Sequence, residues 1–316
     1  MTRVSIVTTL YNKEDSIPYF LAALARQSYA GSVELLVVDD ASTDASVAVF
    51  KKNAAILLAR FSIKLLQNRV NAGNCVSRNA GIAAATGDIL IITDADCVLS
   101  RNFVETYVRA YETPGVVAVV SDYGIELGVR KPLPTLAHFE SHPWQVSWWR
   151  RVQDSPSNSF LNTVTRGFSF RRGALAEPVY DVAFNYTKAE DSGYGWEDVD
   201  VGCRLHQQGT SIAYAAGAFS LHMTHPPVSS ETAKPLRSLQ NFALLHRKHP
   251  WLATEKKRWS RRTYGRIFFA QAKEQLARTP DNDFLEQHLS VSKTTLLLYK
   301  LWGGLYHQAR RLKHAF

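Results

Sequence analysis

Cysteine is scarce in this chain of 316 residues: Cys75, Cys97 and Cys203 are its only three, and no C-x-x-C pair occurs. An odd number of scattered cysteines argues against a disulfide framework and suits a reducing cytosol. No apolar run approaches the roughly 20 residues that span a bilayer, and the N-terminus leads directly into a strand-like segment rather than a secretory signal. We therefore expect a cytoplasmic protein.

A glycine-rich phosphate loop is also missing. The first strand-like segment ends in Thr9-Leu10-Tyr11-Asn12-Lys13-Glu14, where a nicotinamide-binding domain or a P-loop nucleotidase would carry its glycines. Both classes are disfavoured by that absence. Hydrophobic residues nevertheless make up 46% of the chain. That content allows a sizeable core, so we expect one large domain with an appendage.

Strand-like and helix-like segments alternate through the first hundred residues. The expected strands are Val4–Thr9, Glu34–Asp39, Phe61–Leu66 and Ile89–Thr93. The expected helices are Ile17–Gln27 after Asp15-Ser16, a helix after Ser42-Thr43-Asp44, and Asn74–Ala85 with Gly87 as its C-cap. This alternation predicts an α/β fold with a doubly wound, mostly parallel sheet that binds ligands at the carboxyl ends of its strands.

Charge is divided unevenly along the chain. Residues 226–316 carry 17 Lys and Arg against 6 Asp and Glu, whereas residues 1–225 are close to neutral. The change coincides with the turn signal His225-Pro226-Pro227, where we expect a domain boundary.

Residues 226–316 are predicted to form a basic, mainly helical extension. An amphipathic basic pattern within 256–316 favours either peripheral contact with the anionic inner face of the cell membrane or packing on the catalytic domain; no nucleic-acid motif is recognised.

Two carboxylates separated by one residue, Asp94-Ala95-Asp96, follow the fourth expected strand. They stand where open α/β sheets bind ligands. Hard oxygen ligands at such a position suit Mg²⁺ or Mn²⁺ bridged to the phosphates of a substrate. The D-x-D pattern also arises by chance, so its position on the chain gives it weight.

Four segments in order resemble family 2 glycosyltransferases of the GT-A fold: Val4–Asn12, Leu36–Asp44, Asn71–Asp96 and Gly195–Leu205. The last is most similar to the acidic motif of chondroitin-polymerase-type members. The resemblance covers residues 3–225 and gives no information about the C-terminal extension. It implies that residues 1–100 form a nucleotide-sugar-binding half and residues 101–225 the acceptor-binding, catalytic half of one GT-A domain.

On the donor side, the resemblance implies a site made of Thr9, Tyr11, Asp40, Arg78 and Asp94. Asp40 would accept a hydrogen bond from the imide N–H of uracil, Tyr11 would stack on the base and Thr9 would bond to it. Arg78 would reach the diphosphate, and Asp94 the sugar or ribose. The alternatives are a helix cap for Asp40, ordinary packing for Tyr11 and a solvated helix face for Arg78.

For the metal ion, the resemblance implies that Asp96 binds Mn²⁺ or Mg²⁺. His222 is expected as a further ligand, with His225 as the alternative to His222. Cys97 stands where the family more commonly has an acid or asparagine. A thiol assists a hard cation poorly.

The acidic motif supplies the expected catalytic residues. Asp198 is the predicted general base, Glu197 binds the acceptor hydroxyl and Trp196 stacks on the acceptor sugar; the roles of the two acids are interchangeable at this stage. Acids in the first turn also simply cap helices, which is the structural alternative.

The resemblance implies that these residues carry out an inverting transfer of a sugar from a nucleoside-diphosphate donor, with UDP as the expected nucleotide. The acceptor would be a hydroxyl of a glycan or of a lipid-linked molecule, as in polysaccharide biosynthesis. Two alternatives remain: a catalytically silent sugar-binding or scaffold protein on the same fold, and a sugar-1-phosphate nucleotidyltransferase. Thr9–Glu14 does not resemble the glycine- and arginine-rich loop usual in the latter class.

Overall fold

The structure is a computed structural model that describes residues 2–123, 127–128, 160–187, 193–224 and 234–255. The chain divides into two compact units. The first comprises Met1–Lys188 and Glu197–Pro227, and the second comprises Ala189–Trp196 and Val228–Phe316. The short segment before Glu197 therefore groups with the C-terminal part of the chain.

The first unit begins with alternating strands and helices. In chain order they are β1 (Val4–Leu10), α1 (Ile17–Ala25), β2 (Val33–Asp39), α2 (Ser46–Ala54), the 3-10 turn η1 (Ala55–Leu57), β3 (Phe61–Gln67), α3 (Asn74–Ala83) and β4 (Ile89–Ile92). The later elements are β5 (Cys97–Leu99), α4 (Phe103–Ala110), β6 (Val116–Tyr123), β7 (Leu127–Gly128), β8 (Phe168–Arg171), the 3-10 turn η3 (Val182–Phe184), α7 (Glu197–Gln207) and β9 (Ser211–Thr224).

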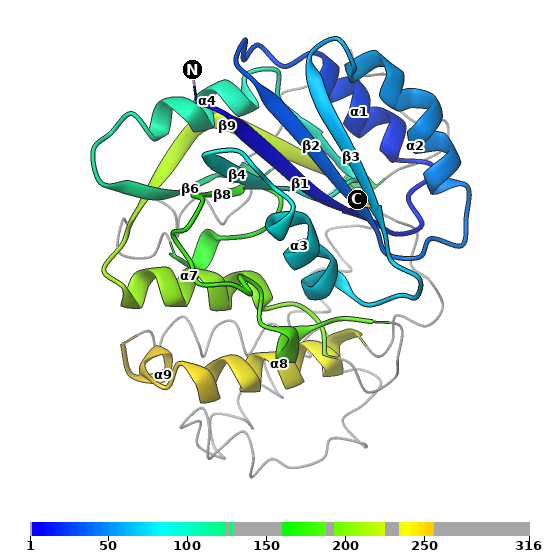
Figure 1. Ribbon diagram of the computed structural model, residues 1–316. Helices are drawn as coiled ribbons and strands as arrows, with labels where there is room; N and C mark the ends of the chain where they lie inside the picture. The colour runs from blue at the N-terminus through cyan, green and yellow to red at the C-terminus, as the bar shows by residue number, and fades with distance from the viewer. Residues whose placement is uncertain (1, 124–126, 129–159, 188–192, 225–233, 256–316) are drawn as a thin grey trace, which may run out of the picture. The chain divides into compact units, whose positions relative to one another are not determined.

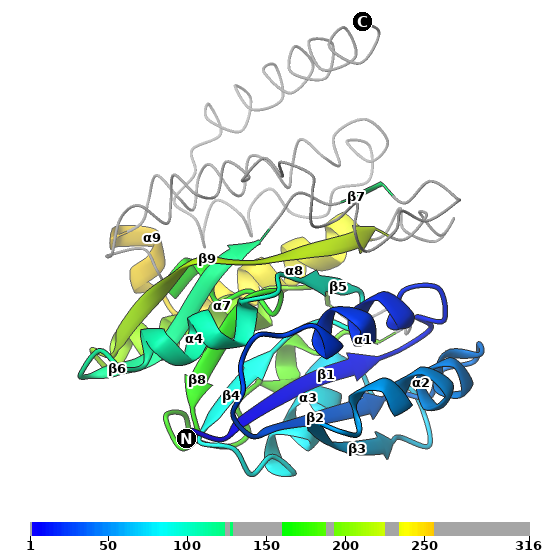
Figure 2. The same ribbon diagram turned by 90° about the horizontal axis from the view of Figure 1, so that it is seen from above.

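The strands of the described residues form one mixed sheet in the order β3-β2-β1-β4-β8-β6-β9-β5, with β7 added beside β9 (Figures 1 and 2). The first four strands are parallel, so the carboxyl ends of β1, β2 and β4 meet at one edge. β8 then runs antiparallel between β4 and β6. The predicted doubly wound, mostly parallel α/β fold class is confirmed.

Apolar side chains alternate between the two faces of this sheet. Ile6, Leu35 and Ile91 belong to the large core cluster formed with α1, α2 and α4. The intervening Val7 faces α3, where a Cβ on Gly81 would lie 2.5 Å from Val7 Cγ1. Strands covered on both faces have near-continuous apolar sequences, as β2 does in Val33–Asp39. Both layers of helices can be followed in Figure 1.

Element ends differ from the sequence prediction in one instructive place. α3 ends at Ala83, and Gly87 is not its C-cap. Gly87 instead donates its N–H to Ser5 Oγ, and a Cβ at this position would lie 2.6 Å from the Ser5 backbone nitrogen. Glycine is needed here because the turn into β4 passes directly against the start of β1.

Within the described part of the second unit, α8 (Lys234–Lys248) is followed by α9 (Trp251–Glu255). The segment just before Glu197 is held to α8: Tyr194 N donates to Arg237 O, and Asn241 Nδ2 donates to Gly195 O. In the part of the chain that the structure describes, no helix has the length and apolar character to cross a membrane. The basic amphipathic pattern predicted within 256–316 lies outside the described residues.

Candidate active site

The carboxyl ends of β1, β2 and β4 carry the polar residues of the candidate site. β1 leads to Tyr11 and Lys13, β2 ends in Asp39 and is followed by Asp40, and β4 leads to the Asp94–Asp96 turn. The parallel register pairs Leu10 with Asp39, which aligns the ends of the first two strands. This is the edge at which sequence reasoning placed the ligand.

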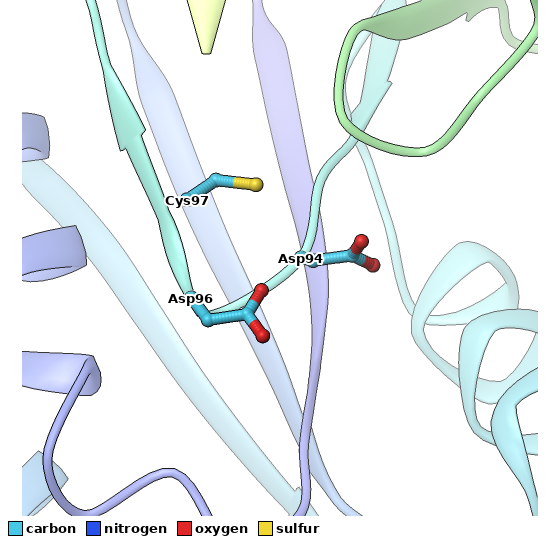
Figure 3. Close-up of side chains that lie close together, drawn as sticks. All are labelled: Asp94, Asp96 and Cys97. Carbon is cyan, nitrogen blue, oxygen red and sulfur yellow. The ribbon is translucent and has the colours of Figure 1, made fainter. Parts of the chain in front are cut away.

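Asp94, Asp96 and Cys97 form the only cluster of three metal-ligating side chains found among the described residues, with ligand atoms within 4.8 Å of one another. Figure 3 shows the two carboxylates on the turn between β4 and β5, with the Cys97 sulfur farther along β5. Burial, together with the charges of Asp94 and Asp96, raises the pKa of the Cys97 thiol. The two carboxylates are the more suitable ligands for a hard cation, because a thiol is a soft ligand.

His222 lies beside Asp96 from the neighbouring strand β9. It pairs with Cys97 in the antiparallel register of β5 and β9, and its Nε2 lies 3.2 Å from Asp96 Oδ2. A carboxylate and an imidazole at this distance fit a divalent cation such as Mn²⁺ or Mg²⁺. His225, the alternative ligand considered from the sequence, lies outside the described residues.

Arg78 connects this turn to the acidic motif. Its Nη1 lies 2.8 Å from Glu197 Oε1 and 3.6 Å from Asp198 Oδ1, while Nη2 lies 3.3 Å from Asp94 Oδ1. The residue is 7% exposed and its guanidinium stacks over the ring of Tyr180. Burial opposes its charge, but Asp198, Glu197 and Asp94 outweigh burial and raise the pKa of Arg78. The solvated helix face considered as the alternative for Arg78 is not what the structure shows, and its contact with the diphosphate stays a prediction.

Glu197 and Asp198 open α7, where the helix dipole favours acids. Glu197 Oε1 also accepts from Asn74 Nδ2 at 2.6 Å, and Asp198 Oδ2 accepts from Thr165 N at 3.3 Å. Burial and the charge of Glu197 raise the pKa of Asp198 to about 8, although Arg78 pulls in the opposite direction. A buried carboxyl with a pKa near neutrality has the properties of a general base or acid.

Asp40 lies in an arrangement that sequence reasoning did not find. Its Oδ1 accepts from Asn68 Nδ2 and Ala72 N, and its Oδ2 accepts from Asn71 Nδ2 and Gly73 N, all within 2.9 Å. The carboxylate thereby fixes the loop that enters α3, rather than capping α2. The Asn71-Ala72-Gly73 motif was the available signal, because it places donors just before a helix. Recognition of the base by Asp40 stays a prediction.

Lys13 is the main residue that sequence reasoning missed. It follows β1 directly, and its Nζ lies 2.6 Å from Asp96 Oδ2. The signal was a lone cation at the carboxyl end of a central parallel strand. Thr9 and Tyr11 stand at the same strand end and are both partly exposed.

Trp196 belongs to the second unit, where its Nε1 donates to Ser238 Oγ and its ring packs against Phe242 at a centroid distance of 4.8 Å. Its φ of 73° is unusual for a residue other than glycine. Stacking of Trp196 on an acceptor sugar stays a prediction.

A family model described as glycosyl transferase family 2 matches residues 5–177, which is more than half of the chain. The chain belongs to this family. Chondroitin synthase of Escherichia coli is 22% identical over 294 residues, covering 84% of this chain and 41% of that protein. This chain spans less than half the length of several such curated relatives.

Two solved structures share the fold. TarS 1–349 of S. aureus in complex with UDP superimposes with a TM-score of 0.53 at 16% identity, covering 92% of this chain and 73% of that chain. The mannosyltransferase PcManGT from Pyrobaculum calidifontis in complex with GDP-Man and Mn²⁺ gives a TM-score of 0.57 at 16% identity, covering 96% and 86%. At this identity the similarity concerns the fold alone.

Proposed function

We propose that the protein is a glycosyltransferase that transfers a sugar from a nucleoside-diphosphate donor, with UDP as the first expected nucleotide, to an acceptor hydroxyl. The observation that carries the proposal is that one buried arginine contacts both groups of acids. Arg78 contacts Asp94 after β4 and also Glu197 and Asp198 at the start of α7. Family membership supports the proposal, and two proteins that share the fold were solved with UDP and with GDP-Man and Mn²⁺.

The donor side is proposed to lie at the ends of β1, β2 and β4. Thr9 and Tyr11 would contact the base, and Asp94 the sugar or ribose. All four hydrogen bonds to the Asp40 carboxylate come from donors of the protein itself. The imide N–H of a bound base must therefore replace one of these donors to be recognised by Asp40. Arg78 would likewise reach the diphosphate by exchanging a carboxylate partner for a phosphate oxygen.

The metal ligands are proposed to be Asp96 and His222. A Mn²⁺ or Mg²⁺ ion bound there supplies positive charge that stabilises the departing nucleoside diphosphate. The carboxylate–imidazole pair at 3.2 Å supports this assignment, since one ion can contact both groups.

The chemical step is proposed to be an inverting displacement with Asp198 as the base. The acceptor oxygen forms a bond to the anomeric carbon as the bond from that carbon to the diphosphate oxygen breaks, and Asp198 receives the hydroxyl proton. The raised pKa of Asp198 supports this role, because a stronger base accepts the proton more readily once it is ionised. Glu197, fixed by Arg78 and Asn74, would orient the acceptor hydroxyl.

The acceptor is proposed to be a glycan or a lipid-linked molecule. A lipid-linked acceptor would suit a peripheral position on the inner face of the membrane, reached through the basic residues of 256–316.

The test is release of nucleoside diphosphate from a panel of UDP-, GDP- and dTDP-sugars with Mn²⁺ or Mg²⁺. Asp198→Asn is compared with Asp88→Asn, a control at an exposed aspartate that pairs with Arg3 near the amino ends of the strands. We expect slow, metal-dependent release by the wild type and the control, and none by Asp198→Asn. Release of pyrophosphate would instead indicate a nucleotidyltransferase. Calorimetry without binding of any donor would indicate a silent scaffold.

A further inference from the structure

The ammonium group of Lys13 forms an ion pair with Asp96, the carboxylate that the proposed function assigns as a metal ligand. Lys13 Nζ is 2.6 Å from Asp96 Oδ2, and His222 Nε2 is 3.2 Å from the same oxygen. The Asp96 side chain is 2% exposed and that of Lys13 is 20% exposed. The ammonium therefore compensates a carboxylate that water hardly reaches.

The main chain holds Lys13 at this place independently of its side chain. Lys13 N donates to Ser46 Oγ at 2.6 Å, and Lys13 O accepts from Ser16 N and Ile17 N. The loop after β1 is thereby tied to the first turns of α1 and α2. An exchange of the side chain alone leaves these anchors in place, so its effect on Asp96 can be measured separately.

A divalent ion bound to Asp96 Oδ2 would approach the oxygen that this ammonium contacts. With a ligand distance of about 2.1 Å for Mg²⁺, an ion on Asp96 Oδ2 would lie within about 5 Å of the present position of Nζ. Like charges at that separation repel strongly where water is largely excluded. Either the ion binds weakly or the ammonium moves to another acceptor.

We propose that Lys13 competes with the metal ion for Asp96, so that the ion binds weakly to the protein alone and tightly only together with a nucleoside diphosphate. The diphosphate provides the displaced ammonium with new anionic oxygens at the same edge of the sheet. Metal and donor then strengthen each other's binding, and the reciprocal effect has the same size for both. This inference rests on the metal assignment in the proposed function.

The test measures Mn²⁺ affinity without any nucleotide, from the electron paramagnetic resonance signal of free Mn²⁺. Lys13→Met removes the charge and keeps the aliphatic stem, whereas Lys13→Arg keeps a charge. Lys64→Met is the matched control, because Lys64 pairs with Glu34 near the amino end of β2. Asp96→Asn reports whether the ion uses this site. Thermal unfolding checks each variant, and Lys13→Gln replaces Lys13→Met if the latter does not fold.

Lys13→Met is expected to bind Mn²⁺ about tenfold more tightly than the wild type, while Lys64→Met and Lys13→Arg remain close to it. The factor by which Mn²⁺ strengthens UDP binding, measured by calorimetry, should fall by a similar amount in Lys13→Met. Unchanged or weaker Mn²⁺ binding by Lys13→Met, with binding lost in Asp96→Asn, would overturn the competition and leave the proposed function intact. Mn²⁺ binding that is absent, or unaffected by Asp96→Asn, would overturn the metal assignment and the inference with it.

Discussion

Replacement of Arg78 by methionine tests the central ionic contacts of the site. The substitution keeps much of the aliphatic volume and removes the charge that faces Glu197, Asp198 and Asp94. Removing one partner of a buried ion pair typically costs about 3–5 kcal/mol, because the remaining charges are left without compensation. Arg78 is 7% exposed, so we expect a loss of unfolding free energy in that range at pH 8.

The loss should depend on pH in a defined direction. Arg78 lowers the pKa of Asp198, so its removal raises that pKa further above the value in the unfolded chain. A carboxyl whose pKa is raised by folding contributes stability at low pH that is lost as the pH rises through its folded pKa. The variant should therefore be less impaired at pH 5 than at pH 8.

Urea unfolding at both pH values measures these effects. Arg109→Met is the matched control, because Arg109 forms an exposed pair with Glu105 four residues earlier in the chain and should lose less than about 1 kcal/mol. A loss at Arg78 no larger than that of the control, or one independent of pH, would refute the electrostatic reasoning.

Three further outcomes are expected. Asp198→Asn should lower kcat by about 10²–10⁴. The wild-type kcat/KM should rise with pH through about 8, because the base acts in its ionised form. A wild-type profile that falls over this range would contradict the assignment of Asp198 as the base. Asp40→Asn puts an amide N–H donor in place of a carboxylate oxygen that accepts from a backbone N–H. The free energy of unfolding should therefore fall by about 1–3 kcal/mol, measured by thermal unfolding with the exposed Asp88→Asn as the control. Chelation by EDTA should abolish nucleoside diphosphate release and added Mn²⁺ should restore it; full activity in EDTA would exclude the metal role of Asp96.

The strands, and the strand edge that carries the candidate site, were predictable because local patterns determine them. The apolar run of Ile89–Ile92 and the acids after it appear in the sequence in the order in which the structure uses them. The long-range partners were not predictable in the same way. Arg78 and Glu197 are separated by 119 positions, and no periodicity reports that α3 and α7 approach each other.

The Lys13–Asp96 pair illustrates the same limit at shorter range. Both residues follow strands that lie side by side in the sheet, but the sequence does not state that β1 and β4 are neighbours. Asp40 presents a different case, because the sequence indicated a functional or structural role for this carboxylate but did not indicate which role. A carboxylate after a strand suits a ligand, a helix cap or a loop anchor, and the positions of Ala72 N and Gly73 N show that Asp40 anchors the loop rather than capping a helix.

Helix α3 joins the two halves of the site mechanically. Asp40 holds the amides just before its first turn, while Asn74 and Arg78, one turn apart on the same side of the helix, both bond to Glu197 Oε1. A shift of one residue in the preceding loop would rotate these side chains by about 100° and break both bonds. Redesign of the 68–73 loop would therefore disturb Glu197, the residue proposed to orient the acceptor hydroxyl, although none of the exchanged residues would touch it.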